Sequence, residues 1–245
     1  TSSTSTSAFT GAVSDAALLA GDLSINGFAI SPSVSDGVSF ASSSTSAIAK
    51  ANAINASSSL TGITATVKAT SVESTSFTAA ASTGAVAAGS LLINGVDIGP
   101  LEAFTGAGSA AGRAAQVVGA INAKSSQTGV SATVTNTDKV TMTATDGRNI
   151  TANWVTATGL AGFASGVGTV TTRGSLDLKS STGATSAAIT GLAITKIGSD
   201  LSGSTVSLTR GTVTGQTVSS VDLSTQTGSQ AALSILDNAI DTVTN

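Results

Sequence analysis

The 245-residue chain contains no cysteine and no histidine. Disulfides, thiol nucleophiles, zinc-finger ligand spacings and Ser-His-Asp triads are therefore excluded. The side chain that most often changes its charge near neutral pH is missing as well. We expect a protein that is not an enzyme, with no catalytic residue, no metal site and no cofactor.

Aromatic residues and charges are also scarce. Aromatics make up 3% of the chain, with one Trp and no Tyr, and 13 acidic residues stand against 10 basic ones. Without a basic patch, nucleic-acid binding is disfavoured. The chain has no run of about 18 apolar residues, so no membrane span is expected. It starts TSSTSTSAFT, without Met and without a basic, apolar signal peptide, so we expect a fragment of a longer protein.

What the chain does contain is an internal repeat. DLSINGFAIS (residues 22–31) and SLLINGVDIG (90–99) each place Asn-Gly between short apolar stretches. Asn-Gly favours a type I′ hairpin because both residues tolerate positive φ. The sequence therefore predicts two tight hairpins, one turning at Asn26-Gly27 and the other at Asn94-Gly95.

A second shared segment follows each hairpin. Residues 46–67 and 112–134 both contain Ala-Ile-Asn-Ala, then Thr-Gly and then Ala-Thr-Val. Together the matches define a repeat of roughly 67 residues, a period that is best sought before single elements. The residues that define it are Ile25, Asn26, Gly27, Ile54, Asn55 and Gly62 in the first copy, and Ile93, Asn94, Gly95, Ile121, Asn122 and Gly129 in the second.

Each copy is expected to contain one helix. Apolar residues at helical spacing form a stripe over residues 114–121 and a narrower one over 47–54. Gly62 and Gly129 then turn the chain into the next strand. The predicted fold class is α+β: two small repeated modules of β-hairpin, helix and strand, with additional antiparallel β segments and a C-terminal amphipathic helix.

Three further motifs lie outside the repeated pattern. Asp146-Gly147 predicts a third hairpin between strands at 140–145 and 149–155. Trp154 is expected to anchor a sheet core rather than to stack on a sugar. GAGSAAG at 106–112 lacks the spacing of a phosphate-binding loop and is expected to be a loop that leads into the second helix.

The order of the segments predicts a division into domains. We expect a first module at residues 1–75 and a second, inserted module at 76–170. A β-rich segment at 171–222 is expected to return and pack on the first module. Residues 223–245 are expected to begin a helical region, because apolar residues recur at helical spacing over 232–243.

The repeat and the tail carry a family resemblance. Ile-Asn-Gly followed by Ala-Ile-Asn, Thr-Gly and Ala-Thr-Val, over 20–67 and 88–134, resembles the IN motif of bacterial flagellins and hook-associated proteins. The tail VDLSTQTGSQAALSILDNAIDTV resembles the start of the C-terminal conserved helical region of flagellin. RGSLDLKSSTGATSAAI resembles the strands that precede that region.

This resemblance implies the surface-exposed variable part of the structural subunit of the bacterial flagellar filament, an extracellular, secreted protein of motility. In flagellins the terminal helices pack into the filament core, and the central domains project into solvent. The implied partners are other flagellin subunits, bound through terminal helices that this chain lacks. We therefore expect the fragment to be monomeric.

Two other functions stay open. The outer domains would bind a cell-surface glycan or act as an adhesin through loops near 31–44 and 99–112, since exposed loops often carry function. The cations available for an anionic polysaccharide are Lys50, Lys68, Arg113 and Lys124. Alternatively, the chain is a hook-associated or filament-cap protein, although the flagellin-like helix after residue 224 favours flagellin.

Overall fold

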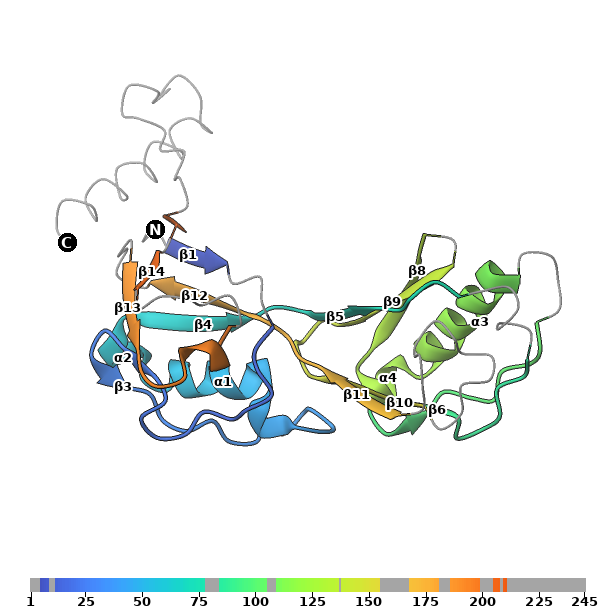
Figure 1. The fold of residues 1–245 in the computed structure, drawn as a ribbon, viewed down its shortest axis with the longest axis horizontal. Coiled ribbons are helices and arrows are strands. Elements are labelled where there is room, and N and C mark those ends of the chain that lie inside the picture. Colours follow the sequence, from blue (N-terminus) through green and yellow to red (C-terminus); the bar gives the residue numbers. More distant parts are fainter. Residues whose placement is uncertain are drawn as a thin grey trace, which may run out of the picture.

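A computed structural model describes residues 5–8, 12–77, 84–104, 109–136, 138–154, 168–180, 186–198, 205–207 and 209–210. Helices and short antiparallel strands make this part of the chain an α+β fold, as the sequence predicts. Figure 1 shows two lobes along the long axis, joined by a narrow waist of strands. We call the described parts of 5–67 and 176–210 lobe 1, and the described parts of 70–172 lobe 2.

Lobe 1 is built from two stretches that are far apart in the sequence. The first holds β1 (Ser5–Ala8), β2 (Ser24–Ile25), β3 (Phe28–Ala29), the 3-10 helix η1 (Ser43–Thr45), α1 (Ala47–Asn55), α2 (Ser58–Thr61) and β4 (Ile63–Val67). The second holds β12 (Leu176–Ser180), β13 (Ser186–Thr190), the 3-10 helix η2 (Ile194–Lys196), β14 (Thr205–Ser207) and β15 (Thr209–Arg210). These strands form two antiparallel sheets, of order β15-β1-β12-β4 and β14-β13-β2-β3.

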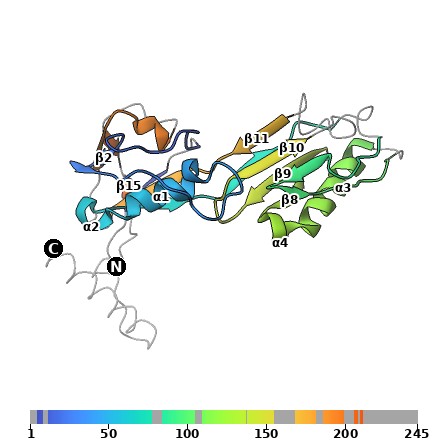
Figure 2. The same cartoon turned by 90° about the horizontal axis from the view of Figure 1, so that it is seen from below.

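Lobe 2 comes from one stretch of the chain. Its elements are β5 (Thr70–Glu73), β6 (Leu91–Ile93), β7 (Val96–Asp97), α3 (Ser109–Ala123), α4 (Ser125–Thr128), β8 (Ser131–Thr135), β9 (Lys139–Ala144), β10 (Ile150–Trp154) and β11 (Gly168–Thr172). They form two antiparallel sheets, of order β5-β9-β8 and β11-β10-β6-β7. The long helix α3 lies alongside β8 and β9 (Figure 2).

The two lobes have the same strand order. The sheet β1-β12-β4 of lobe 1 corresponds to β5-β9-β8 of lobe 2, and β14-β13-β2-β3 corresponds to β11-β10-β6-β7. In lobe 1 the chain leaves after β4, forms the whole of lobe 2, and returns as β12 to pair with β4. The outgoing and returning segments meet at the waist, where the backbone N–H of Lys68 donates to the carbonyl of Ser175 at 3.0 Å. Each lobe therefore repeats one pattern of sheets and helices.

Local chemistry explains the hairpins and the helix ends. Both hairpins predicted from Asn-Gly are present, and all four turn residues have positive φ, from 49° to 84°. The helices over 47–55 and 109–123 are confirmed as well. Gly62 and Gly129 follow α2 and α4 with φ of 69° and 70°, a left-handed conformation that glycine adopts without a steric penalty.

Each lobe has its own apolar core. In lobe 1 the cluster includes Leu23, Ile25, Ile54, Ile63, Leu178 and Ile189. In lobe 2 it includes Leu91, Ile93, Ile121, Val140, Met142 and Trp154. Trp154 is 6% exposed on β10, as expected of a residue that anchors a sheet core. Burial of one such aliphatic side chain stabilises a fold by roughly 1.5–3 kcal/mol.

The predicted third hairpin at Asp146-Gly147 is wrong. The chain does turn there, with φ of 79° at Gly147, but β9 pairs with β8 and β5, whereas β10 pairs with β6 and β11. Asn149 would have begun the second strand of that hairpin. Both edges of β9 are already paired, with β8 and with β5, so β10 cannot pair with it and joins the other sheet of lobe 2; the backbone N–H of Asn149 donates to Ser39 of lobe 1. The predicted helix over 232–243 lies outside the described residues.

Candidate functional site

The first asparagine of the repeat ties three segments of lobe 1 together. The side chain of Asn26 donates from Nδ2 to the carbonyl of Thr61 at 2.8 Å. Its Oδ1 accepts the backbone N–H of Ala188 at 3.0 Å, and its own N–H donates to the Ala188 carbonyl at 2.8 Å. The tip of the β2–β3 hairpin is thereby fixed to the end of α2 and to β13.

The equivalent asparagine does the same in lobe 2. Asn94 donates from Nδ2 to the carbonyl of Thr128 at 2.8 Å. Its Oδ1 accepts the N–H of Thr151 at 2.8 Å, and its N–H donates to the Thr151 carbonyl at 2.7 Å. Every partner of Asn26 thus has a counterpart here, with α4 in place of α2 and β10 in place of β13.

The second asparagine of the repeat pairs with the strand that follows the helix. Asn55 donates to the carbonyl of Ala65 at 2.9 Å and accepts its N–H at 2.7 Å. Asn122 makes the same two bonds to Ala132, at 2.9 Å and 2.8 Å. Both alanines are only 4% exposed. Because β4 and β8 are edge strands of their sheets, these backbone groups have no neighbouring strand to pair with.

A threonine completes each set. Thr61 accepts the N–H of Ile63 on its Oγ1 at 3.1 Å, and Thr128 accepts that of Val130 at the same distance. Each threonine lies directly before the glycine that turns the chain into the edge strand. The carbonyl of the same threonine accepts the bond from the first asparagine. The Thr-Gly pair of the repeat is therefore the point where hairpin, helix and edge strand meet.

We call Asn26, Asn55, Asn94 and Asn122 the asparagine braces. A primary amide offers one donor and one acceptor side by side, so it can bond both backbone groups of a strand residue. Aspartate would lose the donor, and an aliphatic residue would leave buried polar groups unpaired, at about 1–3 kcal/mol each. The chemistry of the repeated motif is therefore architectural, since every brace bonds the protein's own backbone.

Lys50, which was predicted to be available for a polysaccharide, is instead buried inside lobe 1. Its ammonium donates to the carbonyls of Ser14 and Lys196, both at 2.7 Å. Burial, followed by the positive charges of Arg173 and Lys196, lowers the pKa of Lys50 to about 7. Lys50 thus fastens the incoming and returning stretches of lobe 1 to α1.

Arg113 is the corresponding correction in lobe 2. It is fully buried, and its guanidinium donates to the side-chain oxygen of Gln116 at 2.6 Å, to the carbonyl of Glu102 at 3.1 Å and to the carbonyl of Gly84. Burial lowers the pKa of Arg113. Its charged group binds two loops to α3 and does not reach solvent.

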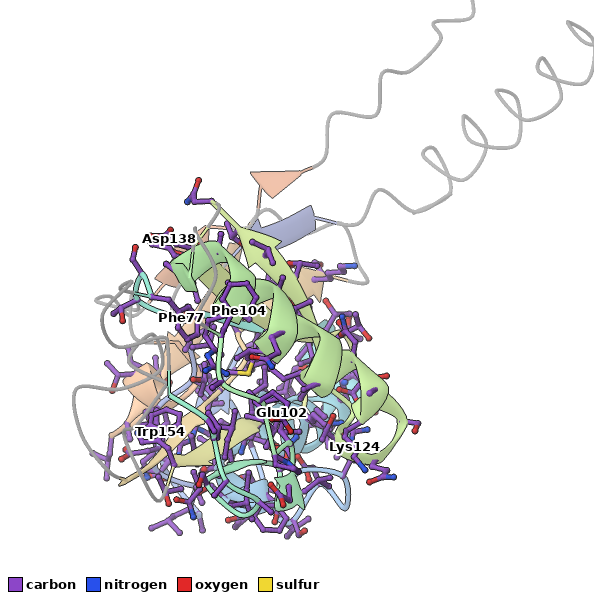
Figure 3. All side chains as sticks on the ribbon, turned by 90° about the vertical axis from the view of Figure 1, so that its right-hand side faces the viewer. Phe77, Glu102, Phe104, Lys124, Asp138 and Trp154 are labelled. Atoms are coloured by element: carbon purple, nitrogen blue, oxygen red, sulfur yellow. The ribbon has the colours of Figure 1, made fainter. Side chains whose placement is uncertain are left out.

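The other two cations are more accessible. Lys68 lies at the waist, with its ammonium 2.9 Å from a carboxylate oxygen of Asp177. Lys124 is partly exposed between α3 and α4, and Figure 3 places it at the far end of α3 from Phe104. The structure does not bring the four predicted cations together. Polysaccharide binding stays a prediction, with Lys68 and Lys124 as its accessible residues.

Neither a metal-binding cluster nor a membrane-spanning helix is found in the described part of the chain. No group of three or more acidic side chains is placed to hold a metal ion there. None of the helices described there is long and apolar enough to cross a membrane. Sequence reasoning missed the burial of Lys50, although Lys50 falls on the apolar stripe of α1 with Ala47, Ala51 and Ile54.

Comparison with known proteins supports the structural interpretation of the motif. No curated protein matches the chain. Residues 90–146, from β6 to β9, match the family model described as the flagellin hook IN motif. This stretch contains Asn94 and Asn122, the two asparagine braces of lobe 2. The chain therefore carries a flagellin-related domain, which points to a flagellin- or hook-related structural protein.

Proposed function

We propose that this chain is the surface-exposed variable region of the structural subunit of the bacterial flagellar filament. The observation that carries the proposal is the repetition of the braces. Lobe 2 contains the matched IN motif, and lobe 1 makes the same bonds with Asn26 and Asn55. We accordingly regard residues 22–67 as a second copy of that motif.

The chain organisation fits an outward projection. We propose residues 1–75 and 171–222 as an inner module, residues 76–170 as an inserted outer module, and 223–245 as the start of a helical region. Other subunits would bind through terminal helices that lie outside this chain. Both connections to lobe 2 run through the waist, so lobe 2 extends away from lobe 1, which contains β1 (Figure 1).

The braces supply a physical reason for this role. A domain on the outside of a polymer must keep its shape without help from neighbouring subunits. Each lobe does so through its own core and its own pair of braces, and no bond of a brace involves a charged side chain. Uncharged amide bonds hold over a wide range of pH and salt. The proposed role is structural and non-enzymatic.

Immunoelectron microscopy on cells that produce the full protein tests the proposal. Antibodies raised against lobe 2 are expected to label filaments evenly along their length. Label confined to the filament tip or to the hook would indicate a cap or hook-associated protein instead. Label on the cell body and none on filaments would exclude a flagellar role. Light scattering on the isolated chain is expected to give the monomer mass.

A further inference from the structure

The segment between β3 and α1 reaches out of lobe 1 and contacts lobe 2. Asn149, which lies just before β10, is fully buried against it. The backbone N–H of Asn149 donates to Ser39 Oγ at 3.0 Å. Its side-chain Nδ2 donates to the carbonyls of Ala41 and Ser42 at 3.0 Å and 3.1 Å. One asparagine of lobe 2 is therefore held by three bonds from residues 39–42 of lobe 1.

The loop that makes these bonds is itself held in one shape. The carboxylate of Asp36 accepts the N–H groups of Val38 and Ser39 and the hydroxyls of Ser39 and Ser46, at 2.6–3.0 Å. Ser46 is also the N-cap of α1, where it accepts the N–H of Ala49 at 3.0 Å. A continuous set of hydrogen bonds thus runs from the start of α1, through Asp36 and Ser39, to Asn149.

Backbone geometry gives independent support. Ser42, which accepts one of the bonds from Asn149, has φ of 55° and ψ of 37°. A residue other than glycine keeps this left-handed conformation only where surrounding contacts impose it, at a cost of about 1–2 kcal/mol. The bond from Asn149 to the carbonyl of Ser42 is one such contact, beside the two bonds that the same carbonyl accepts from Thr45. The shape of the loop therefore depends in part on lobe 2.

Two more contacts join the same loop to lobe 2 and the waist. The ring of Phe40 lies against Gly95, at the tip of the β6–β7 hairpin, where an added Cβ would collide with it. The guanidinium Nε of Arg173, at the returning side of the waist, donates to Thr45 Oγ1 at 3.1 Å. The loop therefore touches lobe 2 at two separate places and the waist at a third.

The residues that correspond to Gly95 and Phe40 in the other copy of the repeat do not make a matching contact. The matching hairpin tip in lobe 1 is at Gly27, where a Cβ would meet no described atom within 4 Å. In lobe 2, Phe104 precedes α3 much as Phe40 precedes α1, but its ring packs on Gly112 of its own helix. The contact between loop and lobe is thus specific to the junction and is not a consequence of the repeat.

We propose that residues 36–46 form a strut that holds the two lobes in one relative orientation, with Asn149 as the positioning residue that the strut grips. Two antiparallel segments alone make a waist that can bend and twist. At one side of it, Val67 lies against Gly147 of lobe 2. The strut adds a third point of support to one side. This inference concerns the isolated chain and does not depend on the proposed function.

Distance measurement between two spin labels tests the strut. The chain has no native cysteine, so labels can be placed at chosen sites alone. Leu60→Cys in α2 and Gln127→Cys in α4 are exposed and occupy equivalent positions in the two lobes. The parent chain is expected to give one narrow distribution of distances. Asn149→Ala is expected to give a distribution about twice as broad.

Two further variants make the test decisive. Asp36→Ala lies in lobe 1 and removes all four bonds that hold the loop without altering lobe 2, so it is expected to broaden the distribution too. Phe28→Ala removes a partly exposed phenylalanine away from the junction and is expected to leave the distribution narrow. If Asn149→Ala unfolds lobe 2, as the fluorescence of Trp154 would report, Asp36→Ala decides the test. A narrow distribution in the folded variants would overturn the proposal, because the waist alone would then fix the orientation.

Discussion

The two lobes share a strand order and a set of braces, yet they fill the space beneath their helices differently. Ile54 and Ile121 are equivalent, so Lys50 of α1 stands where α3 has Val117. Val117 is fully buried among apolar side chains, whereas Lys50 is fully buried with its ammonium bonded to two carbonyls. The frame set by the braces therefore tolerates either an apolar residue or a charge at one buried position.

This difference shows which parts of the repeat carry the fold. The bonds of the asparagine braces agree between the lobes to within 0.2 Å. The cations that tie loops to the helices come from different helix positions and bind different segments. We infer that the braces specify the fold, and that the buried cations only attach the loops that each lobe happens to have.

Removing a brace should have the largest effect. Asn122→Ala leaves the buried N–H and carbonyl of Ala132 unpaired, so we expect the free energy of unfolding of lobe 2 to fall by about 2–4 kcal/mol. Urea unfolding followed by the fluorescence of Trp154, the single Trp, reports lobe 2 directly. The exposed Gln127→Ala is the control and should change stability by less than about 0.5 kcal/mol. Equal midpoints for the two variants would contradict the role of the brace.

The buried lysine should make lobe 1 respond to pH where lobe 2 does not. The pKa of Lys50 is about 7 in the folded chain and close to 10.5 when unfolded, so the unfolded chain binds more protons between these values. Stability of lobe 1 should rise as the pH rises from about 7 to 10.5, and this gain should be absent below pH 7. The charges that act on Lys50 are Arg173, Lys196 and Asp15.

Hydrogen exchange of α1, followed by mass spectrometry at several pH values after correction for intrinsic rates, measures this effect. In Lys50→Met the dependence of the α1 exchange rate on pH should disappear. At pH 6 the amides of α1 should exchange as slowly in this variant as in the parent, or more slowly. A buried ion is replaced there by an apolar side chain of similar length. Faster exchange in Lys50→Met than in the parent at pH 6 would show that the ammonium bonds outweigh the cost of burial.

The turn glycines should be sensitive in both lobes. Gly62→Ala places a Cβ on a residue with φ of 69°, which costs about 1 kcal/mol. Gly129→Ala, with φ of 70°, should cost at least as much in lobe 2, because its Cβ would also displace the guanidinium of Arg148. The measurement is the midpoint of urea unfolding, taken in lobe 2 for Gly129→Ala and in lobe 1 for Gly62→Ala. Each midpoint is compared with that of the same lobe in the parent chain. A neutral result in one lobe alone would mean that the two Thr-Gly turns are not equivalent.

The surface ion pair of lobe 2 should matter least. Lys139 Nζ lies 2.8 Å from Glu73 Oε1, and both side chains are about one third exposed or more. Solvent-exposed pairs of this kind contribute little to stability and weaken further in salt. Lys139→Met should therefore shift the urea midpoint of Trp154 fluorescence only slightly. In 1 M salt, where the Debye length falls to roughly 3 Å and the pair is screened, the variant should cause no shift. A shift as large as that of Asn122→Ala would refute this ranking.

Local structure could be predicted from the sequence because its causes are local. Asn26-Gly27 and Asn94-Gly95 have the backbone freedom for a type I′ turn wherever they occur. The helix stripes and the turns at Gly62 and Gly129 likewise depend on a few neighbouring residues. The α+β class and the repeat followed from these signals.

The bonds between distant segments could not be predicted in the same way. Ala188, which bonds Asn26, lies 162 positions further along the chain, and nothing near Asn26 identifies it. The false hairpin at Asp146-Gly147 has the same origin, because the distant strand β5 pairs with the edge of β9 that β8 leaves open, and nothing near Asp146 identifies β5. For Lys50 two local signals conflict: its charge favours the surface, whereas its position on the apolar stripe of α1 favours burial, and the carbonyls of Ser14 and Lys196 that make burial possible are distant in sequence.

The exchange of the side-chain amide protons of asparagine, measured by NMR, tests the central claim most directly. Asn26, Asn55 and Asn122 are exposed, as is Asn52 of α1, so the difference to be measured is the hydrogen bonding of the amide. If the same braces hold both lobes, the Nδ2 protons of Asn26, Asn55, Asn94 and Asn122 should all exchange more slowly than those of Asn52. The account is contradicted if the lobe 1 pair, Asn26 and Asn55, exchanges as fast as Asn52 while the lobe 2 pair is protected.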